Sequence, residues 1–162
     1  MSSIVCFHNP EEINGYLSNW HLSDFVYDGV KFSSLEQYMM YKKAEVFDDN
    51  DAAEKILNTD DPVKIKSLGR SVKNYNDIVW NGVRQVVVYE GLYAKFSQDE
   101  NLKALLLGTG EDILAECAVK DNIWGIGLSM TDENRFDMSK WKGQNLLGFS
   151  LMEVRNRIKK EG

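Results

Sequence analysis

A glutamate and a lysine on one predicted helix are the first residues whose types and spacing could support chemistry. Ser33 or Ser34 can cap a helix that runs to about Phe47, and Ser33-x-x-Glu36 has capping-box spacing. At 100° per residue, Glu36 and Lys43 share one edge of this helix, roughly 10 Å apart. They flank an apolar stripe of Leu35, Tyr38, Met39 and Val46, with Met40 and Phe47 beside it. A carboxyl and an amine among apolar groups are candidates for perturbed pKa values and for acid–base or amine chemistry.

Spacing alone leaves a second interpretation of Glu36 and Lys43 open. Both side chains can border the core and extend their charged ends into water, because long charged side chains commonly cover apolar surface in this way.

A second candidate segment is the loop 120–128, with the sequence KDNIWGIGL. Asp121 supplies a carboxyl, Trp124 a face on which a base or sugar can stack, and Gly125 a close approach of backbone to a ligand. Its Gly-x-Gly lacks the third glycine of a dinucleotide-binding fingerprint. The alternative interpretation is a structural turn that covers the core.

Two polar segments could contact a ligand through amides. One is Leu17–Trp20, which contains Asn19 and Trp20, and the other is 143–148, where Asn145 begins the C-terminal helix. A helix N-terminus favours phosphate. An N-cap is the equally weighted alternative for Asn145.

Signatures of other chemistries are missing from the sequence. It has no GxSxG, SxxK or Walker motif. His8, His21, Cys6 and Cys117 have no metal-ligand spacing, so we expect neither a metal nor a cofactor. Two cysteines without a CxxC, and an N-terminus without a basic or long apolar region, predict a cytoplasmic protein with buried or idle thiols.

Size and charge favour one soluble domain over residues 1–162. The chain has 162 residues, 43% hydrophobic residues and a net charge of −6. A chain of this length buries roughly 70% of its unfolded surface, and no apolar run reaches the ~20 residues that cross a bilayer. The acidic balance disfavours tracking along duplex backbone but leaves room for one phosphorylated ligand.

The predicted elements give a mainly helical α+β fold with a small N-terminal sheet or hairpin. A short strand is expected at 4–8, and Asp28-Gly29 between apolar residues predicts a hairpin over 25–32. Further helices are expected at 52–57, from Pro62 to about Gly69, 76–98, 102–107, 111–117 and from Asn145 onward.

These segments, taken in order, resemble the NADAR (NAD and ADP-ribose associated), or YbiA-like, family. The resemblance extends from Leu17 to Arg155. It rests on LSNW (17–20), DGVKFSSLEQYMMYKK (28–43), LGR (68–70), GLYAKFSQ (91–98), LLLGTG (105–110), DNIWGIG (121–127) and NLLGFSLMEVR (145–155). Each segment is weak alone, and the ordered set is specific.

The resemblance implies a YbiA-like fold and hydrolysis of N-glycosidic bonds. Family members are similar to enzymes that cleave phosphoribosylated pyrimidine intermediates of riboflavin synthesis, or that remove ADP-ribose from guanine. The expected partner is thus a small ribosyl phosphate or an ADP-ribosylated nucleobase or nucleic acid, with no obligate protein partner. The implied catalytic residues are Glu36, Lys43 and Asp121, and the implied substrate contacts are Asn19, Trp20, Trp80, Trp124, Gly125 and Asn145.

In that interpretation Lys43 attacks the anomeric carbon through an imine on ring-opened ribose. Glu36 serves as acid and base, Asp121 as a second carboxylate, and Trp80 or Trp124 as a stacking surface. The sequence departs from the family at Gln37 in place of histidine, at Lys42-Lys43-Ala44 in place of QKF, and at Leu146 in place of arginine. These departures bear on the substrate more than on the reaction class.

Two other functions remain as alternatives. A non-catalytic module that binds ADP-ribose or a related nucleotide needs the tryptophans and amides but not Lys43 or Glu36. An interaction protein would use the same motifs only to determine its fold.

Overall fold

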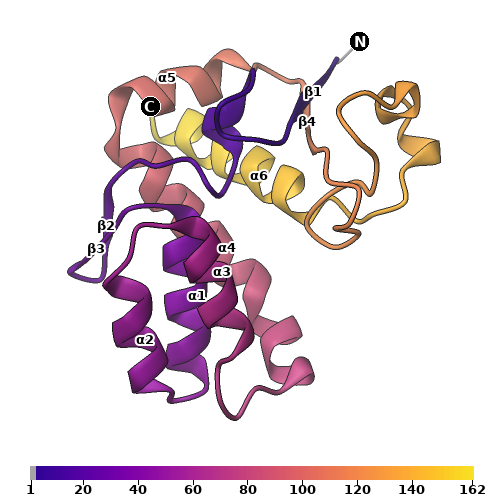
Figure 1. The fold of residues 1–162 in the computed structure, drawn as a ribbon. Coiled ribbons are helices and arrows are strands. Elements are labelled where there is room, and N and C mark those ends of the chain that lie inside the picture. Colours follow the sequence, from indigo (N-terminus) through magenta and orange to yellow (C-terminus); the bar gives the residue numbers. More distant parts are fainter. Residues whose placement is uncertain (1–2) are drawn as a thin grey trace. The chain divides into compact units, whose positions relative to one another are not determined.

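The computed structural model describes residues 3–162, which are predominantly helical with two small two-stranded sheets (Figure 1). The predicted mainly helical α+β class is confirmed. Contacts divide the chain into two compact units, one holding residues up to His21 together with Asp99–Gly162, the other Leu22–Gln98. The expectation of one domain over 1–162 stays a prediction. Among the described residues, no helix combines the length and apolar character needed to cross a membrane.

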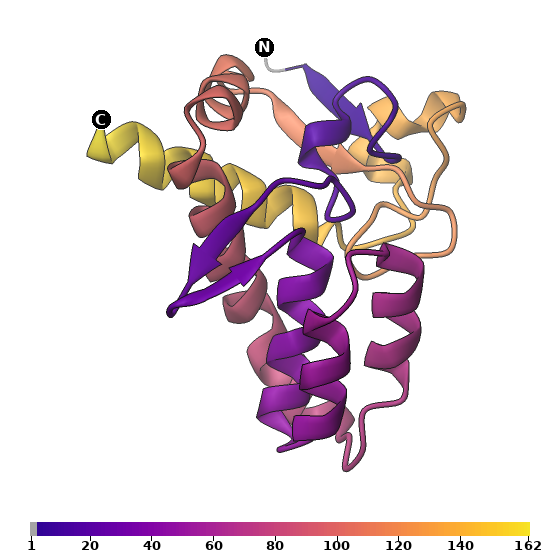
Figure 2. The same ribbon diagram turned by 60° about the vertical axis from the view of Figure 1, so that its left-hand side comes forward.

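The unit Leu22–Gln98 is built around α1 (Leu35–Val46), which contacts all three other helices of the unit. These are α2 (Asn50–Leu57), α3 (Pro62–Arg70) and α4 (Asp77–Gln98), seen from a second side in Figure 2. Asp61 caps α3 through its carboxylate, and Pro62 occupies the first turn as predicted. The long predicted helix over 76–98 is confirmed, including the Val86–Tyr89 run that could have formed a strand.

The predicted hairpin is confirmed. Strands β2 (Phe25–Tyr27) and β3 (Val30–Phe32) pair antiparallel through Asp28 and Gly29, whose φ angles are 50° and 77°. Two successive positive φ values define the turn that matches strand twist, and glycine adopts them without strain. The hairpin places Phe25 and Phe32 against Tyr38 of α1.

The start of α1 differs from the predicted capping box by one residue. Ser34 is the N-cap, because its Oγ accepts a hydrogen bond from the Gln37 amide at 3.1 Å. Gln37 Oε1 in turn accepts from the Ser33 amide at 2.7 Å, so Gln37 rather than Glu36 completes the cap. The Glu36 carboxyl is thereby released from the capping role. Val46, predicted on the buried stripe, is 36% exposed, while Ala44 is buried.

The other unit contains a parallel pair, β1 (Ile4–Phe7) with β4 (Ile113–Glu116), against which α6 (Leu146–Glu161) packs. The helix predicted over 111–117 is therefore wrong. The short apolar run there pairs with a strand 109 residues earlier, a partner that local periodicity cannot reveal. Leu114 and Ala115 are both fully buried, as expected for a strand covered on both faces.

The remaining elements of this unit are α5 (Glu100–Gly108), which contacts α6, and three short 3₁₀ helices. These are η1 (Gly15–Leu17), η2 (Glu133–Phe136) and η3 (Met138–Lys140). The predicted buried stripe of the C-terminal helix is confirmed at Leu147, Leu151, Val154 and Ile158.

Candidate active site

Helix α1 holds Glu36 and Lys43, the predicted acid–base residue and nucleophile. Glu36 is only 6% exposed, so its carboxyl does not extend into water as the alternative interpretation required. Lys43, two turns further on, is half-buried. The structure thus brings a buried carboxyl and a partly buried amine to one edge of one helix, as the spacing predicted.

The surroundings of Lys43 favour its neutral amine. Burial lowers the pKa of Lys43, and the positive charge of Arg70 lowers it further, whereas the carboxylates of Glu36 and Asp77 raise it. The net direction is downward. An amine with a lowered pKa is more often unprotonated at neutral pH and can then attack carbon.

Close packing of α3 on α1 accompanies this arrangement. A Cβ at Gly69 would lie 1.9 Å from Met40 Sδ, so glycine permits the two helices to approach. Arg70 follows Gly69 directly. The LGR segment therefore has two physical roles. Its glycine allows α3 to approach α1, and the charge of its arginine lowers the pKa of Lys43.

Trp80 lies on α4 in the same unit and is 6% exposed. Its stacking role stays a prediction. Sequence reasoning missed another amine on this helix, Lys95, which is 1% exposed. Burial lowers the pKa of Lys95 to about 7. No sequence pattern distinguished it, because its burial depends on packing around α4.

The side chain of Asp121 stabilises the loop that contains Trp124. Asp121 Oδ1 accepts hydrogen bonds from the amides of Ile123 at 3.0 Å and Trp124 at 2.8 Å. This is a turn closed by an aspartate side chain. Gly125 is buried, and a Cβ there would lie 2.9 Å from the carbonyl oxygen of Glu116. Both residues fix the loop beside the end of β4.

Asn145 has a positive φ of 54° and is fully buried at the start of α6. It occupies the N-cap position, but its side chain makes no capping hydrogen bond. Instead Oδ1 accepts from the Glu116 amide at 3.0 Å, and Nδ2 donates to the Leu114 carbonyl at 2.9 Å. The amide thus continues the hydrogen bonding of β4, an arrangement that neither sequence interpretation anticipated.

Asn19 and Trp20 follow η1 and are both half-buried. The Trp20 amide donates to Ser18 Oγ at 3.2 Å. Asn19 Oδ1 is buried and has no hydrogen-bond partner in the described part of the chain. A buried oxygen in this state is a natural contact for a ligand N–H or O–H group.

Glu116, at the end of β4, is a residue that sequence reasoning missed. Burial, and then the negative charge of Asp121, raise the pKa of the Glu116 carboxyl to about 8. The available signal was a glutamate ending an apolar run. Because a helix was predicted over 111–117, Glu116 was not recognised as the last residue of a strand.

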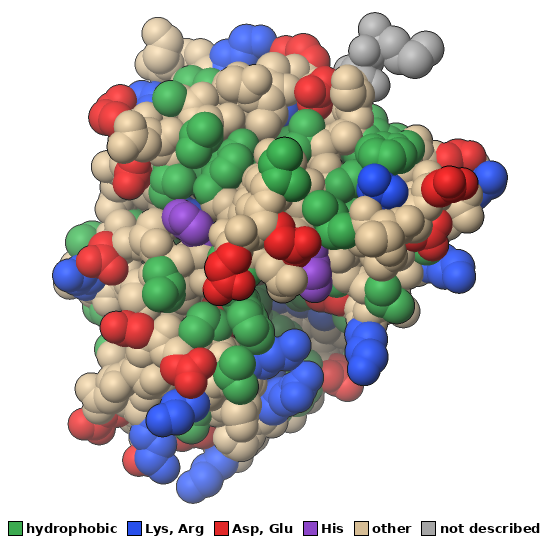
Figure 3. Space-filling view, turned by 45° about the horizontal axis from the view of Figure 1, so that its top comes forward, with side chains coloured by type: hydrophobic (Ala, Val, Ile, Leu, Met, Phe, Trp, Pro, Cys, Tyr) green, Lys and Arg blue, Asp and Glu red, His purple; other side chains and the backbone are tan. Residues whose placement is uncertain are grey.

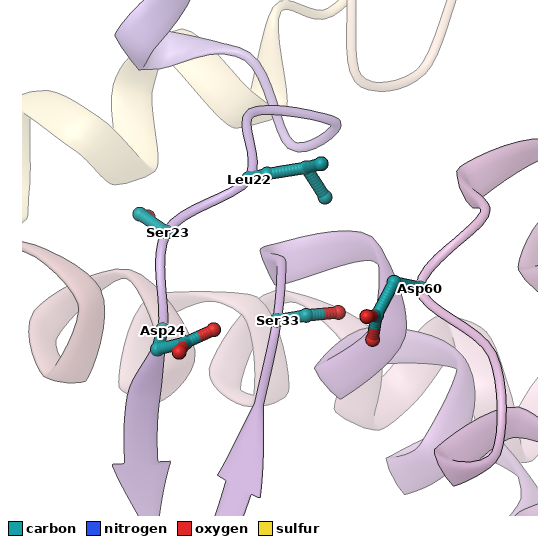
Figure 4. A pocket seen from close by; sticks show the side chains of 5 residues that line it. All are labelled: Leu22, Ser23, Asp24, Ser33 and Asp60. Carbon is teal, nitrogen blue, oxygen red and sulfur yellow. The ribbon is translucent and has the colours of Figure 1, made fainter.

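The predicted site residues fall into two groups. Glu36, Lys43 and Trp80 belong to the unit Leu22–Gln98, whereas the remaining six belong to the other unit, namely Asn19, Trp20, Asp121, Trp124, Gly125 and Asn145. An acidic pocket of about 300 Å³ in the first of these units is lined by none of them (Figure 4). Its lining residues are Leu22, Ser23, Asp24, Ser33 and Asp60.

Known proteins share both the sequence pattern and the fold. An N-glycosidase of Acanthamoeba polyphaga mimivirus is 38% identical over 146 residues, covering 90% of this chain and 82% of that protein. The N-glycosidase YbiA of Escherichia coli is 30% identical over 96% of this chain and 89% of its own length. Its solution structure superposes with a TM-score of 0.82 over 99% of this chain and 88% of that one.

A third relative is a riboflavin biosynthesis protein of Vibrio vulnificus, 30% identical over 98% of this chain but only 39% of that protein. The fold and these relatives define a small helical α+β enzyme of the N-glycosidase class. The NADAR domain model matches residues 6–159, and the chain belongs to that family. The predicted family and enzyme class are confirmed.

Proposed function

We propose that this chain hydrolyses the N-glycosidic bond between a ribose and a nucleobase or related amine, with Lys43 as nucleophile. The observation that carries the proposal is the Glu36–Lys43 pair on α1. One member is a buried carboxyl, and the other is an amine whose pKa is lowered by burial. Such a pair suits proton transfer and attack at carbon.

The proposed chemistry begins at C1 of the ribose. The neutral Lys43 amine bonds to C1, the bond from C1 to the leaving nitrogen breaks with its electron pair going to nitrogen, and a proton joins that nitrogen. Water then hydrolyses the imine between Lys43 and ring-opened ribose, which frees the sugar and restores the amine. Glu36 accepts the proton lost by the amine and passes it to the leaving nitrogen, and the two hydrogens of the water restore the amine.

The residues of the other unit have proposed roles that differ in their support. Asp121 Oδ1 holds the turn through two backbone hydrogen bonds, and a role of its carboxyl in stabilising positive charge stays a prediction. Trp124 and Trp80 are proposed stacking surfaces. Asn19 is supported as a ligand contact by its unpartnered Oδ1.

Two substrate classes suit this proposal. One is guanine carrying ADP-ribose, so that the enzyme reverses ADP-ribosylation. The other is a phosphoribosylated aminopyrimidine of riboflavin synthesis, which is supported by the name of the Vibrio relative.

Basic side chains gather on part of the face shown in Figure 3, so the net charge of −6 does not make the surface uniformly repulsive to phosphate. Free cysteines at positions 6 and 117 support a reducing, cytoplasmic location.

The test measures release of the base and traps the covalent intermediate. ADP-ribosylated guanosine and ribosylaminopyrimidine phosphate are incubated separately with the enzyme, and the released base is measured by chromatography. Borohydride should trap a covalent ribosyl adduct, and peptide mapping should locate it at Lys43 rather than at the buried Lys95. Lys43→Ala should lose both turnover and adduct. Lys42→Ala is the matched control, because Lys42 pairs with Glu45 at 3.0 Å. Wild-type turnover in Lys43→Ala would exclude the imine.

A binding module is the second candidate, favoured by the unpartnered Asn19 Oδ1. It predicts tight binding of ADP-ribose with no base released from either substrate. An interaction protein predicts neither binding nor a thermal shift. The two substrate incubations and a titration with ADP-ribose separate all three functions.

A further inference from the structure

The pocket of about 300 Å³ is formed by the unit Leu22–Gln98 alone. Its walls come from three short segments of that unit, namely the residues before β2, the residue after β3 and the loop between α2 and α3 (Figure 4). Sites for small ligands occupy roughly 300 to 1,000 Å³. The pocket lies at the lower end of that range, so its size suits one ring system rather than a whole dinucleotide.

One buried amide holds two of these segments together. Gln37 is 2% exposed, and its Oε1 accepts hydrogen bonds from the Ser33 amide at 2.7 Å and from Ser33 Oγ at 3.1 Å. Its Nε2 donates to the carbonyl oxygen of Thr59 at 2.9 Å, one residue before Asp60. The Ser23 amide donates to the Ser33 carbonyl at 3.0 Å and so joins the third segment. The walls of the pocket are therefore fixed before any ligand binds.

The polar groups that line the pocket are predominantly hydrogen-bond acceptors. Asp24 and Asp60 contribute carboxylates, which accept hydrogen bonds and donate none. Ser33 Oγ gives its hydrogen to Gln37, so it can act toward a ligand only as an acceptor. Ser23 Oγ is buried and has no hydrogen-bond partner in the described chain, which leaves a further polar group of the lining unsatisfied. A matching ligand supplies N–H groups, whereas a phosphate offers acceptor oxygens and does not match.

Asp60 is the carboxylate best placed to bind a ligand. Asp24 pairs with Lys31 at 3.2 Å, whereas no lysine or arginine of the described chain forms a salt bridge with Asp60. The side chains of Ser33 and Asp60 point toward one another in Figure 4. Two carboxylate oxygens can accept two parallel N–H groups. Leu22, which is 60% exposed, adds an apolar contact for the face of a ring.

We propose that this pocket binds the edge of a nucleobase that carries a ring N–H beside an amino group. Guanine has this edge, and so has any 2-aminopyrimidin-4-one. The Asp60 carboxylate accepts from the ring N–H and from the amino group, Ser33 Oγ is a further acceptor, and Leu22 packs on the ring. The inference rests on the proposed function for the class of ligand, a nucleobase, and assigns the pocket no step at C1.

The position of the pocket on α1 agrees with this role. Gln37, which joins its walls, directly follows Glu36 in the first turn of α1. The pocket, Glu36 and Lys43 all belong to the unit Leu22–Gln98, so binding of the base requires no residue of the other unit. The pocket therefore determines which base is bound.

Guanosine and inosine test the inference, because inosine lacks the amino group and is otherwise identical. By isothermal titration calorimetry, the wild-type protein should bind guanosine roughly 10- to 100-fold more tightly than inosine. Asp60→Asn keeps the size of the side chain but replaces one acceptor with a donor, so it should bind the two nucleosides about equally. Glu54→Gln, the same kind of change at an exposed position on α2, should keep the wild-type preference.

Methyl NMR locates the bound base. The Leu22 methyl resonances should shift when guanosine is added, whereas those of Val63, exposed on α3 of the same unit, should not. The inference is overturned if guanosine does not bind, if inosine binds equally, or if Asp60→Asn keeps the preference. Turnover of an N-riboside in those cases leaves the proposed function intact. Selective guanosine binding at Leu22 without turnover of any N-riboside supports the base pocket and overturns the proposed function.

Discussion

Lys42 and Lys43 are adjacent in the chain but have different surroundings. Lys42 forms a salt bridge with Glu45, whereas Lys43 forms none among the described residues and its Nζ lies 4.5 Å from the centre of the Tyr75 ring. A shared salt bridge stabilises an ammonium, while burial and a neighbouring arginine favour a neutral amine. The chemical difference between two identical side chains thus comes from their environments.

The charge of Arg70 should set part of the pH dependence of the reaction. Arg70→Gln removes a charge that lowers the pKa of Lys43, so that pKa should rise. A nucleophilic amine is active when unprotonated, so the rise of kcat with pH should move to higher pH. The measurement is a pH–rate profile. Lys73→Gln is the control, because that lysine acts on Asp49. An unshifted Arg70→Gln profile would contradict the assignment of Lys43.

Glu116 should also make stability depend on pH. Its folded pKa of about 8 lies above the unfolded value, so between about pH 4.5 and 8 the folded state holds a proton that the unfolded state has lost. This contribution is fully present below that window and is lost as the pH rises through 8. Relative to wild type, the unfolding free energy of Glu116→Gln should therefore rise between about pH 4.5 and 8 and level off above that range. Denaturant titrations at several pH values measure this, with Glu100→Gln as a control expected to show no trend.

At the scale of elements, close approaches between helices position the α1 residues. Gly91 of α4 faces the ring of Tyr38, and a Cβ there would lie 2.3 Å from Tyr38 Cε1. Tyr38 is 1% exposed and packs against the hairpin aromatics, so its ring has little freedom to move. The fit of α4 on α1 therefore requires glycine at this position.

Gly91→Ala should destabilise the protein by about 1–3 kcal/mol, because overpacking outweighs the gain in helix propensity. Gly82→Ala on the same helix is the matched control, since a Cβ there meets nothing within 4 Å. It should stabilise by up to about 1 kcal/mol. Thermal unfolding of the two variants measures the contrast. Equal stabilisation by both would show that Tyr38 does not restrict α4.

At the scale of the whole molecule, one unit is assembled from both parts of the chain that flank Leu22–Gln98. Its β1–β4 pair joins residues 109 positions apart, and a small apolar core beside it contains Cys6, Ala115, Cys117, Ile126 and Leu128. The two cysteines come from different parts of the chain. Both cysteines are therefore buried only when the segments before Leu22 and after Gln98 pack together.

Both thiols should resist modification in the native protein. Cys6 is 7% and Cys117 1% exposed, and neither is in a disulfide. A thiol-specific reagent should find no fast-reacting group in buffer and two in denaturant, because buried thiols are inert. Deleting residues 3–7, which removes Cys6 and unpairs β4, should make Cys117 react in buffer. A fast-reacting thiol in the intact native protein would contradict this packing.

The sequence by itself determined the features that depend on near neighbours. Asp28-Gly29 fixed the hairpin, Asp61-Pro62 the start of α3, and the spacing from Glu36 to Lys43 put both groups on one edge of α1. In each case a turn residue, a cap or helical periodicity acts within a few positions.

Only the tertiary structure decided the features whose partners are remote. Residues 113–116 form a strand because β1 pairs with them, and Asn145 uses its amide to extend that strand instead of capping its helix. The pKa of Glu116 is raised because folding buries its carboxyl near Asp121. Burial and distant pairing set these properties, and neither is contained in the local pattern of residue types.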